Sequence, residues 1–148
     1  MINRRQLFRG AATTLTLSAL PLSAFATEDD VQAALKNLFG DRDITEDRVT
    51  MKLPPIAENG YSVSLKVHVD SPMTEADHVR RIALFAPRNP VPVLGQFHLT
   101  PASGRASVST RIRMAGTQRI LAVAETSDGK LFSGSAETLV TLAACVIL

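Results

Sequence analysis

A strict alternation of apolar and polar side chains constrains the fold of this chain more than any other feature. From residue 61 to residue 70 every odd position is apolar and every even position is polar or charged. A period of two places the apolar side chains on one face of an extended strand, so the segment predicts a half-buried β-strand. Asn59-Gly60, directly before it, favours a turn with positive φ and a hairpin with a strand at 49–53.

Further short strands are expected along the rest of the chain, because turn residues interrupt it at regular intervals. The expected strands cover residues 81–86, 93–99, 105–114, 119–126 and 138–143. With 49–53 and 61–70 they give about seven strands in about 100 residues, which is typical of an antiparallel immunoglobulin-like β-sandwich. The fold class is therefore predicted to be all-β, with the sandwich at residues 49–142.

One short amphipathic helix is expected before the sandwich, at residues 30–39. Its apolar positions follow the spacing of one helix face, at Val31, Ala34, Leu35 and Leu38. Asp29 or Asp30 is expected to cap its N-terminus, and Gly40 suits the left-handed conformation that ends a helix. The charged residues 41–47 are predicted to form a connector.

Residues 1–26 are typical of an export signal rather than of folded structure. Paired arginines, Arg4 and Arg5, precede a modestly apolar run at 11–25 that is diluted by hydroxyl side chains. This run is too short and too polar to span a membrane, which takes roughly 20 mostly apolar residues. A twin arginine before such a run favours the Tat pathway over Sec, and small residues predict cleavage between Ala26 and Thr27. We therefore expect a periplasmic protein without a membrane anchor, whose domain covers residues 27–142.

Removal of this leader changes the charge of the chain. The full sequence has 16 Lys and Arg against 14 Asp and Glu, and Arg4, Arg5 and Arg9 belong to the leader. The mature chain then has 13 basic and 14 acidic side chains, a net charge of −1. Such a balance gives no indication of nucleic-acid binding.

Enzyme chemistry has no recognisable pattern in this sequence. His68, His78 and His98 lack metal-ligand spacing, and each falls on the polar phase of an expected strand or in a loop. Neither a phosphate-binding glycine loop nor a serine nucleophile elbow is present. We therefore predict a protein that is not an enzyme, with no catalytic residue, no metal site and no cofactor.

Cys145 is the remaining candidate for a chemically reactive residue. It is the single cysteine of the sequence, and an unpaired thiol in an oxidising compartment indicates intermolecular pairing or reactivity. The segment that carries it, 143–148, is predicted to be an arm after the last strand. Two interpretations stay open: an exposed thiol on a tether, or a buried cysteine that continues the strand into the core. The residues from Cys145 onward also fit a prenylation box, but that lipid is added in the eukaryotic cytosol, which a bacterial export signal argues against.

Between Leu38 and Cys145 the chain resembles SoxY, the sulfur-carrier subunit of the periplasmic Sox system that oxidises thiosulfate. The resemblance follows the order of the family over most of the predicted mature chain. Its matching stretches are 55–60 before the alternating strand, 71–74, 82–86 with Asn89-Pro90, 97–101, 109–115, 123–129, and Val140-Thr141 leading to Cys145.

The resemblance implies a function as well as an immunoglobulin-like sandwich. SoxY-like chains pair with SoxZ, a second small β-protein, and hold the sulfur substrate covalently on a terminal cysteine. In that system a c-type cytochrome attaches thiosulfate, a hydrolase releases sulfate, and a sulfur dehydrogenase acts on the remaining sulfur. Cys145 is accordingly expected to be the covalent attachment site of a carrier that has a SoxZ-like partner and is served by these separate enzymes.

One departure from the family concerns the surroundings of Cys145. SoxY chains usually end Gly-Gly-Cys-Gly-Gly, whereas here Ala143-Ala144 precede the cysteine and Val146-Ile147-Leu148 follow it. Alanine stiffens the approach to the thiol, and bulky side chains beyond it obstruct a narrow enzyme channel. The sequence therefore leaves two hypotheses: a sulfur carrier with a diverged arm, or a binding module that keeps the fold and the partner contacts without the chemistry.

Overall fold

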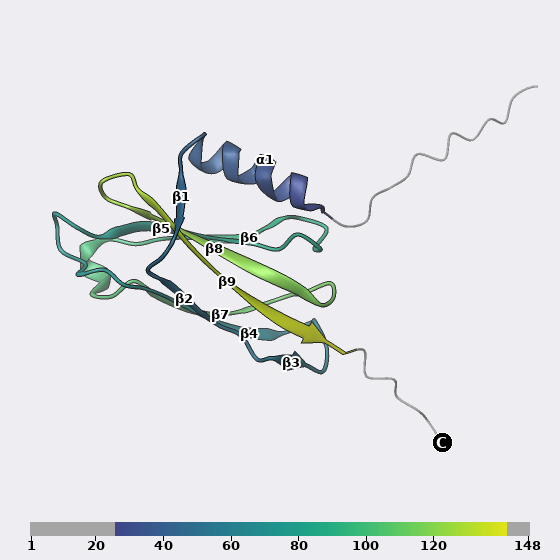
Figure 1. Cartoon of the computed structure of the whole chain (residues 1–148). Coiled ribbons are helices and arrows are strands. Elements are labelled where there is room, and N and C mark those ends of the chain that lie inside the picture. Colours follow the sequence, from purple (N-terminus) through teal and green to yellow (C-terminus); the bar gives the residue numbers. More distant parts are fainter. Residues whose placement is uncertain (1–25, 142–148) are drawn as a thin grey trace, which may run out of the picture.

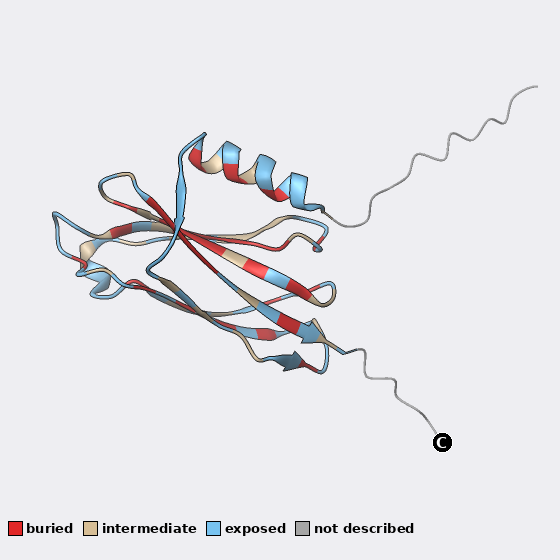
Figure 2. Cartoon of the chain, in the orientation of Figure 1, coloured by how far each residue is buried: buried red, intermediate tan, exposed pale blue. Residues whose placement is uncertain are grey.

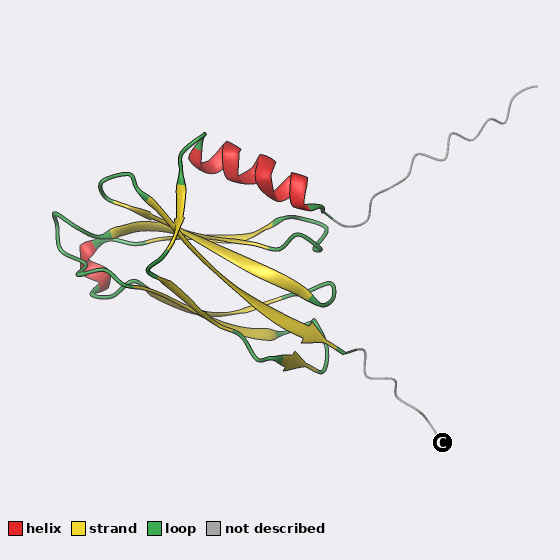
Figure 3. Cartoon of the chain, in the orientation of Figure 1, coloured by secondary structure: helices red, strands yellow, loops and turns green. Residues whose placement is uncertain are grey.

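The computed structural model describes residues 26–141 of the 148-residue chain. A helix and two β-sheets stack in three layers, with the larger sheet between the helix and the smaller sheet (Figures 1 and 3). The elements in chain order are α1 (Glu28–Phe39), β1 (Ile44–Glu46), β2 (Val49–Lys52), β3 (Ile56–Ala57), β4 (Val63–Val69), β5 (Val79–Phe85), β6 (Val93–His98), the short 3₁₀ turn η2 (Pro101–Ser103), β7 (Ser107–Ile112), β8 (Gln118–Thr126) and β9 (Leu131–Val140).

The larger sheet has the strand order β1-β9-β8-β5-β6, and β3 adds to the free side of β9 near its end. The smaller sheet has the order β2-β4-β7. All pairings are antiparallel except those of β1 and β3, which both run parallel to β9. Two packed, mainly antiparallel sheets confirm the predicted immunoglobulin-like sandwich.

The main core lies between the two sheets. β4 points Val63, Leu65, Val67 and Val69 into this core and its polar side chains outward, which confirms the alternation seen in the sequence. The facing side chains come from β5 and β8, among them Ile82, Leu84 and Ile120. Figure 2 shows buried positions along both sheets. Because each fully buried Val or Leu stabilises a fold by about 1.5–3 kcal/mol, this layer is the main source of stability.

A second, smaller core lies between α1 and the outer face of the larger sheet. Val31, Leu35 and Phe39 of the helix pack there against side chains that include Ala83, Phe85, Val123 and Leu131. β5 and β8 are therefore buried on both faces, whereas β4 faces solvent on one. Burial on both faces explains why residues 82–86 are apolar without a break.

α1 begins earlier than the sequence pattern predicted, because Thr27 and not Asp29 or Asp30 is its N-cap. The Thr27 hydroxyl accepts a hydrogen bond from the backbone N–H of Asp30 at 3.4 Å, and the Asp30 carboxylate accepts one from the backbone N–H of Thr27 at 2.7 Å. This reciprocal capping box satisfies two N–H groups that the first helical turn leaves free. Gly40 ends the helix with a positive φ of 72°, which glycine adopts readily, but its ψ of −164° lies outside the left-handed helical region that the sequence predicted.

Other local predictions were wrong. Residues Ile44–Glu46, expected in a connector, form β1, which is too short to show a periodic pattern. Gly60 does not have a positive φ, although β2 and β4 do pair antiparallel around the inserted β3. β9 begins at Leu131 instead of residue 138, because its first four residues are all buried and show no alternation.

Candidate functional site

The predicted functional residues divide between the described and the undescribed parts of the chain. Arg4, Arg5 and Cys145 lie outside the described residues, whereas Ala26 and Thr27, the predicted cleavage site, lie within them. The described chain ends just after β9, at residue 141. The part of the site that can be described is therefore the end of the sandwich from which the predicted arm leaves. We call Val140 and Thr141 the arm root.

Hydrogen bonds on two sides hold the arm root in place. The backbone N–H of Thr141 donates to the carbonyl of Ala57 in β3 at 2.9 Å, and that of Leu139 donates to the carbonyl just before β3 at 3.0 Å. On the other side, the N–H of Val140 donates to the hydroxyl of Thr117 at 2.9 Å. These bonds fix the direction in which the chain leaves the sandwich.

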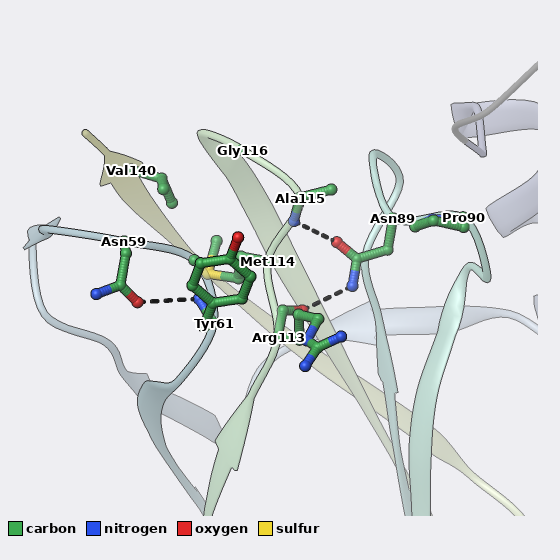
Figure 4. Close-up of a pocket in the computed structure, with 10 residues that line it drawn as sticks. Asn59, Tyr61, Asn89, Pro90, Arg113, Met114, Ala115, Gly116 and Val140 are labelled. Atoms are coloured by element: carbon green, nitrogen blue, oxygen red, sulfur yellow. Dashed lines mark hydrogen bonds between the residues drawn. The ribbon is translucent and has the colours of Figure 1, made fainter. Parts of the chain in front are cut away.

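A pocket opens beside the arm root (Figure 4). Its volume is about 400 Å³ and its wall is mainly apolar. The wall comes from four segments that meet at this end of the sandwich: the β3–β4 loop, the β5–β6 loop, the β7–β8 loop and the end of β9. We call it the arm-root pocket, and its lining residues are Asn59, Gly60, Tyr61, Asn89, Pro90, Arg113, Met114, Ala115, Gly116 and Val140.

Asn89 organises the polar side of this pocket from a buried position. Its amide nitrogen donates to the carbonyl of Arg113 at 2.7 Å, as Figure 4 shows. Its amide oxygen accepts from the N–H of Ala115 and from the side chain of Gln118, both at 2.9 Å. A buried amide without partners is costly, so these bonds hold the β7–β8 loop in the one position that satisfies Asn89.

Gly60 allows two loops to approach each other on the apolar side of the pocket. Its carbonyl accepts a hydrogen bond from the N–H of Met114 at 2.7 Å, and a Cβ on Gly60 would lie 1.8 Å from the Met114 carbonyl oxygen. The next residue, Tyr61, is 76% exposed, and the Arg113 guanidinium lies 5.7 Å from the centre of its ring. An aromatic face and a cation therefore border the mouth of the pocket.

Exposed apolar side chains gather at this same end. Among residues 26–141, Ile44 is the one exposed large hydrophobic residue that lies elsewhere; the others are Ile56, Tyr61, Val91 and Leu139. Ile56 and Leu139 are register partners in β3 and β9, Tyr61 lines the pocket, and Val91 follows a lining residue. We call these four the exposed apolar group. Exposed apolar side chains at one end of a domain are candidates for contact with another protein.

The opposite end of the same strands is closed by charge. Glu125 of β8 accepts hydrogen bonds from Arg42 and Arg81, each at 2.8 Å, and its side chain is 13% exposed. Arg81 also lies 4.5 Å from the ring centre of Phe39, which ties α1 to the sheet. Burial raises the pKa of Glu125, but the hydrogen bonds and charges of the two arginines outweigh it and hold the pKa below its ordinary value.

The three histidines lie apart from the arm root. His68 and His98 are exposed, and Nδ1 of His78 lies 3.0 Å from the carbonyl of Thr74. None of them lines the arm-root pocket. In the part of the chain that the structure describes, no three His, Cys, Asp or Glu side chains are grouped as a metal site requires. Nor is any helix there long and apolar enough to cross a bilayer.

Sequence reasoning missed the residues that build the arm-root pocket. Asn89, Arg113 and Met114 appeared within stretches that resemble the family, and Gly60 appeared in one such stretch and as an expected turn residue. One signal was present: Asn89 lies between Pro87 and Pro90, a spacing that excludes a central strand. That spacing marks a loop without indicating which groups the loop holds.

Comparison with known proteins covers the sandwich and the segment after it. Residues 35–145 match the model of a family described as sulfur oxidation protein SoxY. Among solved structures, the sulfur carrier protein SoxY from Chlorobium limicola f thiosulfatophilum is similar, with a TM-score of 0.66 and 31% sequence identity. That match covers 78% of this chain and 100% of the other. No curated protein matches the chain.

Superoxide reductases share the fold at lower identity. The enzyme (neelaredoxin) from Ignicoccus hospitalis has a TM-score of 0.56 at 18% identity, over 79% of this chain and 95% of the other. A putative superoxide reductase from Thermotoga maritima has a TM-score of 0.53 at 20% identity, over 82% of this chain and 98% of the other. At such identities the likeness concerns the fold alone.

Proposed function

This chain belongs to the SoxY family of sulfur-carrier proteins, and we propose that it holds thiosulfate-derived sulfur covalently on Cys145 during Sox-type sulfur oxidation. One observation carries the proposal: the family match extends through residue 145, beyond the strand that ends the sandwich. The single thiol of the chain therefore falls inside the region shared with a family of sulfur carriers.

The anchored arm root supports this function. A carrier has to present one thiol to several separate enzymes while its own domain stays folded and bound to a partner. Hydrogen bonds to Val140 and Thr141 hold the point from which the arm departs. At 3.3–3.6 Å per residue, the chain from Thr141 to Cys145 reaches up to about 14 Å, which is enough to place the thiol in another protein's channel.

The attachment step is an oxidation that needs an external electron acceptor. An S–S bond forms between the Cys145 sulfur and the terminal sulfur of thiosulfate; the thiol loses its proton, and two electrons pass to a c-type cytochrome. Hydrolysis then releases sulfate and leaves a persulfide on Cys145. An ordinary thiol, with a pKa of about 8.5, is a few per cent ionised at neutral pH, so activation falls to the cytochrome's site.

A labelling experiment tests the proposal. The mature protein is incubated with thiosulfate and an oxidised Sox cytochrome, and the C-terminal peptide is analysed by mass spectrometry. We expect one thiosulfate-derived group on the wild-type peptide, removed by a reductant, and none on Cys145→Ser. A glycine-flanked SoxY serves as the positive control. If the control is modified and this chain is not, the carrier function is wrong, and partner binding by the unmodified chain then favours the binding module.

We propose further that the exposed apolar group binds a SoxZ-like subunit. Leu139 directly precedes the arm root and Ile56 is its register partner, so a partner seated there would lie beside the arm. Ile56→Ser removes a 58%-exposed apolar side chain and should weaken co-purification of the two subunits. Ile44→Ser, on β1, is the matched control, and equal loss of binding from both variants would contradict the assignment.

Export through the Tat pathway, with cleavage between Ala26 and Thr27, completes the proposal. Cleavage there would keep the whole capping box, since Thr27 would be the first residue and its new ammonium would lie against Asp30, 2.7 Å from the carboxylate. Those hydrogen bonds from Thr27 already lower the pKa of Asp30. Mass spectrometry of periplasmic protein should give Thr27 as the N-terminus, and Arg4→Lys with Arg5→Lys should abolish export; a different N-terminus or normal export would contradict this.

A further inference from the structure

The arm-root pocket lies on the side of β9 to which its even-numbered residues point. Thr138 is buried and Val140 is half-buried and lines the pocket, whereas Glu137, Leu139 and Thr141 are exposed. Figure 4 shows the Val140 side chain beside the pocket. Side chains of a strand alternate between its two faces, so the next residue on the pocket side of β9 is residue 142, which is a leucine.

The backbone keeps its strand pairing up to the last described residue. The N–H groups of Leu139 and Thr141, two residues apart, donate to the carbonyls of Pro55 and Ala57, which are also two residues apart. This is the regular spacing of a parallel ladder, so the strand direction is intact at Thr141. A chain that continues along that direction passes the lip of the arm-root pocket.

The pocket has the size and the chemistry for an aliphatic side chain. Cavities of about 150 Å³ lined by apolar side chains hold a benzene molecule. The arm-root pocket, with about 400 Å³, has room for a leucine side chain and the main chain that carries it. Tyr61, Pro90, Met114, Ala115 and Val140 present mainly carbon to it. An apolar pocket open to water leaves hydrophobic surface unburied, and a covering side chain would remove that cost.

We propose that Leu142 fills the arm-root pocket and acts as a positioning residue for the arm. In this position Leu142 would be the next side chain after Thr138 and Val140 on the pocket side of β9. A seated Leu142 would restrict the directions that the residues after it can take. This inference concerns the position of the arm and holds whether the chain is a sulfur carrier or a binding module.

Nuclear Overhauser effects in the full mature protein test the contact directly. Tyr61 is the single tyrosine of the chain, which also has no tryptophan, so its ring signals are unambiguous. We expect cross-peaks from the Leu142 methyl groups to the Tyr61 ring and to the Met114 methyl, and none from Leu139, which lies on the outer face. Absence of the Leu142 cross-peaks overturns the proposal. In a sample that mixes labelled and unlabelled protein, intermolecular cross-peaks would show that a second copy occupies the pocket. Tyr61 ring signals that shift only when a partner protein is added would show that the partner occupies it. Either outcome also overturns the proposal.

A matched pair of variants adds a second test. Leu142→Ser should lower Tm by about 5 °C and make the Tyr61 fluorescence more accessible to acrylamide, because it exposes an apolar seat. Leu139→Ser removes the same side chain from the outer face of the same strand and should change neither quantity. Equal effects of the two variants, or none from either, contradict the proposal. Neither readout involves sulfur, so a failure here is distinct from a failure to modify Cys145.

Discussion

The two ends of the sandwich are built from different chemistry. Where β8 ends and β9 begins, Glu125 joins Arg42 and Arg81 in a network that α1 helps to cover. At the other end of the same strands, Asn89 and Gly60 hold loops around a mainly apolar pocket beside the arm root. One end is closed by paired charges, and the other is left hollow and apolar.

This difference suggests that the charged end stabilises the fold and that the arm end contacts other molecules. The charged end satisfies its groups internally and ties three elements together, so it anchors the fold. At the arm end the polar groups form hydrogen bonds within the loops, because both the nitrogen and the oxygen of the Asn89 amide have partners there. The surface that remains exposed at this end includes several apolar side chains. Apolar surface beside the arm root is where binding is expected.

The largest expected effect comes from breaking the charged end. Glu125→Ala leaves Arg81, whose side chain is 17% exposed, without its carboxylate and should destabilise the fold by about 3 kcal/mol in urea unfolding. Glu137→Ala is the matched control: Glu137 lies 3.9 Å from Arg119 with both side chains well exposed, so its loss should cost less than about 0.5 kcal/mol. Similar costs for both would show that the network does not anchor this end.

Breaking the polar side of the arm end should cost somewhat less. Asn89→Ala leaves the Arg113 carbonyl and the Ala115 N–H without their partner, and should lower the free energy of unfolding by about 2 kcal/mol. Asn59→Ala, in the same pocket, loses one exposed hydrogen bond of 3.1 Å to the N–H of Tyr61, so about 0.5 kcal/mol is expected. Equal losses would mean that Asn89 does not organise the loops.

Two glycines of the arm-root pocket test the close contact between the loops that carry Gly60 and Met114. Gly60→Ala forces its loop away from the Met114 carbonyl and should destabilise by about 1.5 kcal/mol, with a changed Tyr61 fluorescence. Gly116→Ala adds the same methyl group where nothing lies within 4 Å and should stay within about 0.5 kcal/mol of wild type. Chemical denaturation of both variants decides the matter, and a neutral Gly60→Ala would contradict the close loop contact.

The smallest expected effect is a difference in pH dependence. Because the folded-state pKa of Glu125 is lowered, its contribution to stability is present above the unfolded value of about 4.3 and is lost as pH falls through the folded value. Glu125→Gln should therefore lose less stability than wild type between about pH 5 and about pH 3. Urea unfolding at the two pH values measures this, and identical losses would show that Glu125 is not held in its ionised form.

The sequence predicted the parts of the fold that face water on one side. β4 was recognised because solvent on its outer face forces every second residue to be polar. The start of β9 was not recognised, because four consecutive buried residues there show no alternation. The helix was placed from its apolar face, but its first residue was misplaced because Thr27 and two aspartates are all good caps, and only the three-dimensional hydrogen bonds distinguish them.

The candidate site was predicted less completely than the fold. The lone thiol and its place after the last strand could be predicted, because the sequence gives the residue types and their order along the chain directly. The arm-root pocket could not, since Asn89, Gly60 and Val140 are far apart in the chain and become neighbours only through the sheet pairing. Gly60 shows the limit well: the dipeptide Asn59-Gly60 favours a turn, whereas the structure uses the missing Cβ for a close loop contact.

Thiosulfate oxidation by a reconstituted Sox system shows whether Cys145 carries the sulfur. Electron transfer to the cytochrome is followed with this chain, a SoxZ-like subunit and the separate enzymes, and wild type is compared with Cys145→Ser. Circular dichroism and partner binding confirm that the variant is folded and assembled. We predict thiosulfate-dependent reduction with wild type and none above background with Cys145→Ser. Equal rates for the two proteins would contradict the assignment of Cys145 as the sulfur-carrying residue.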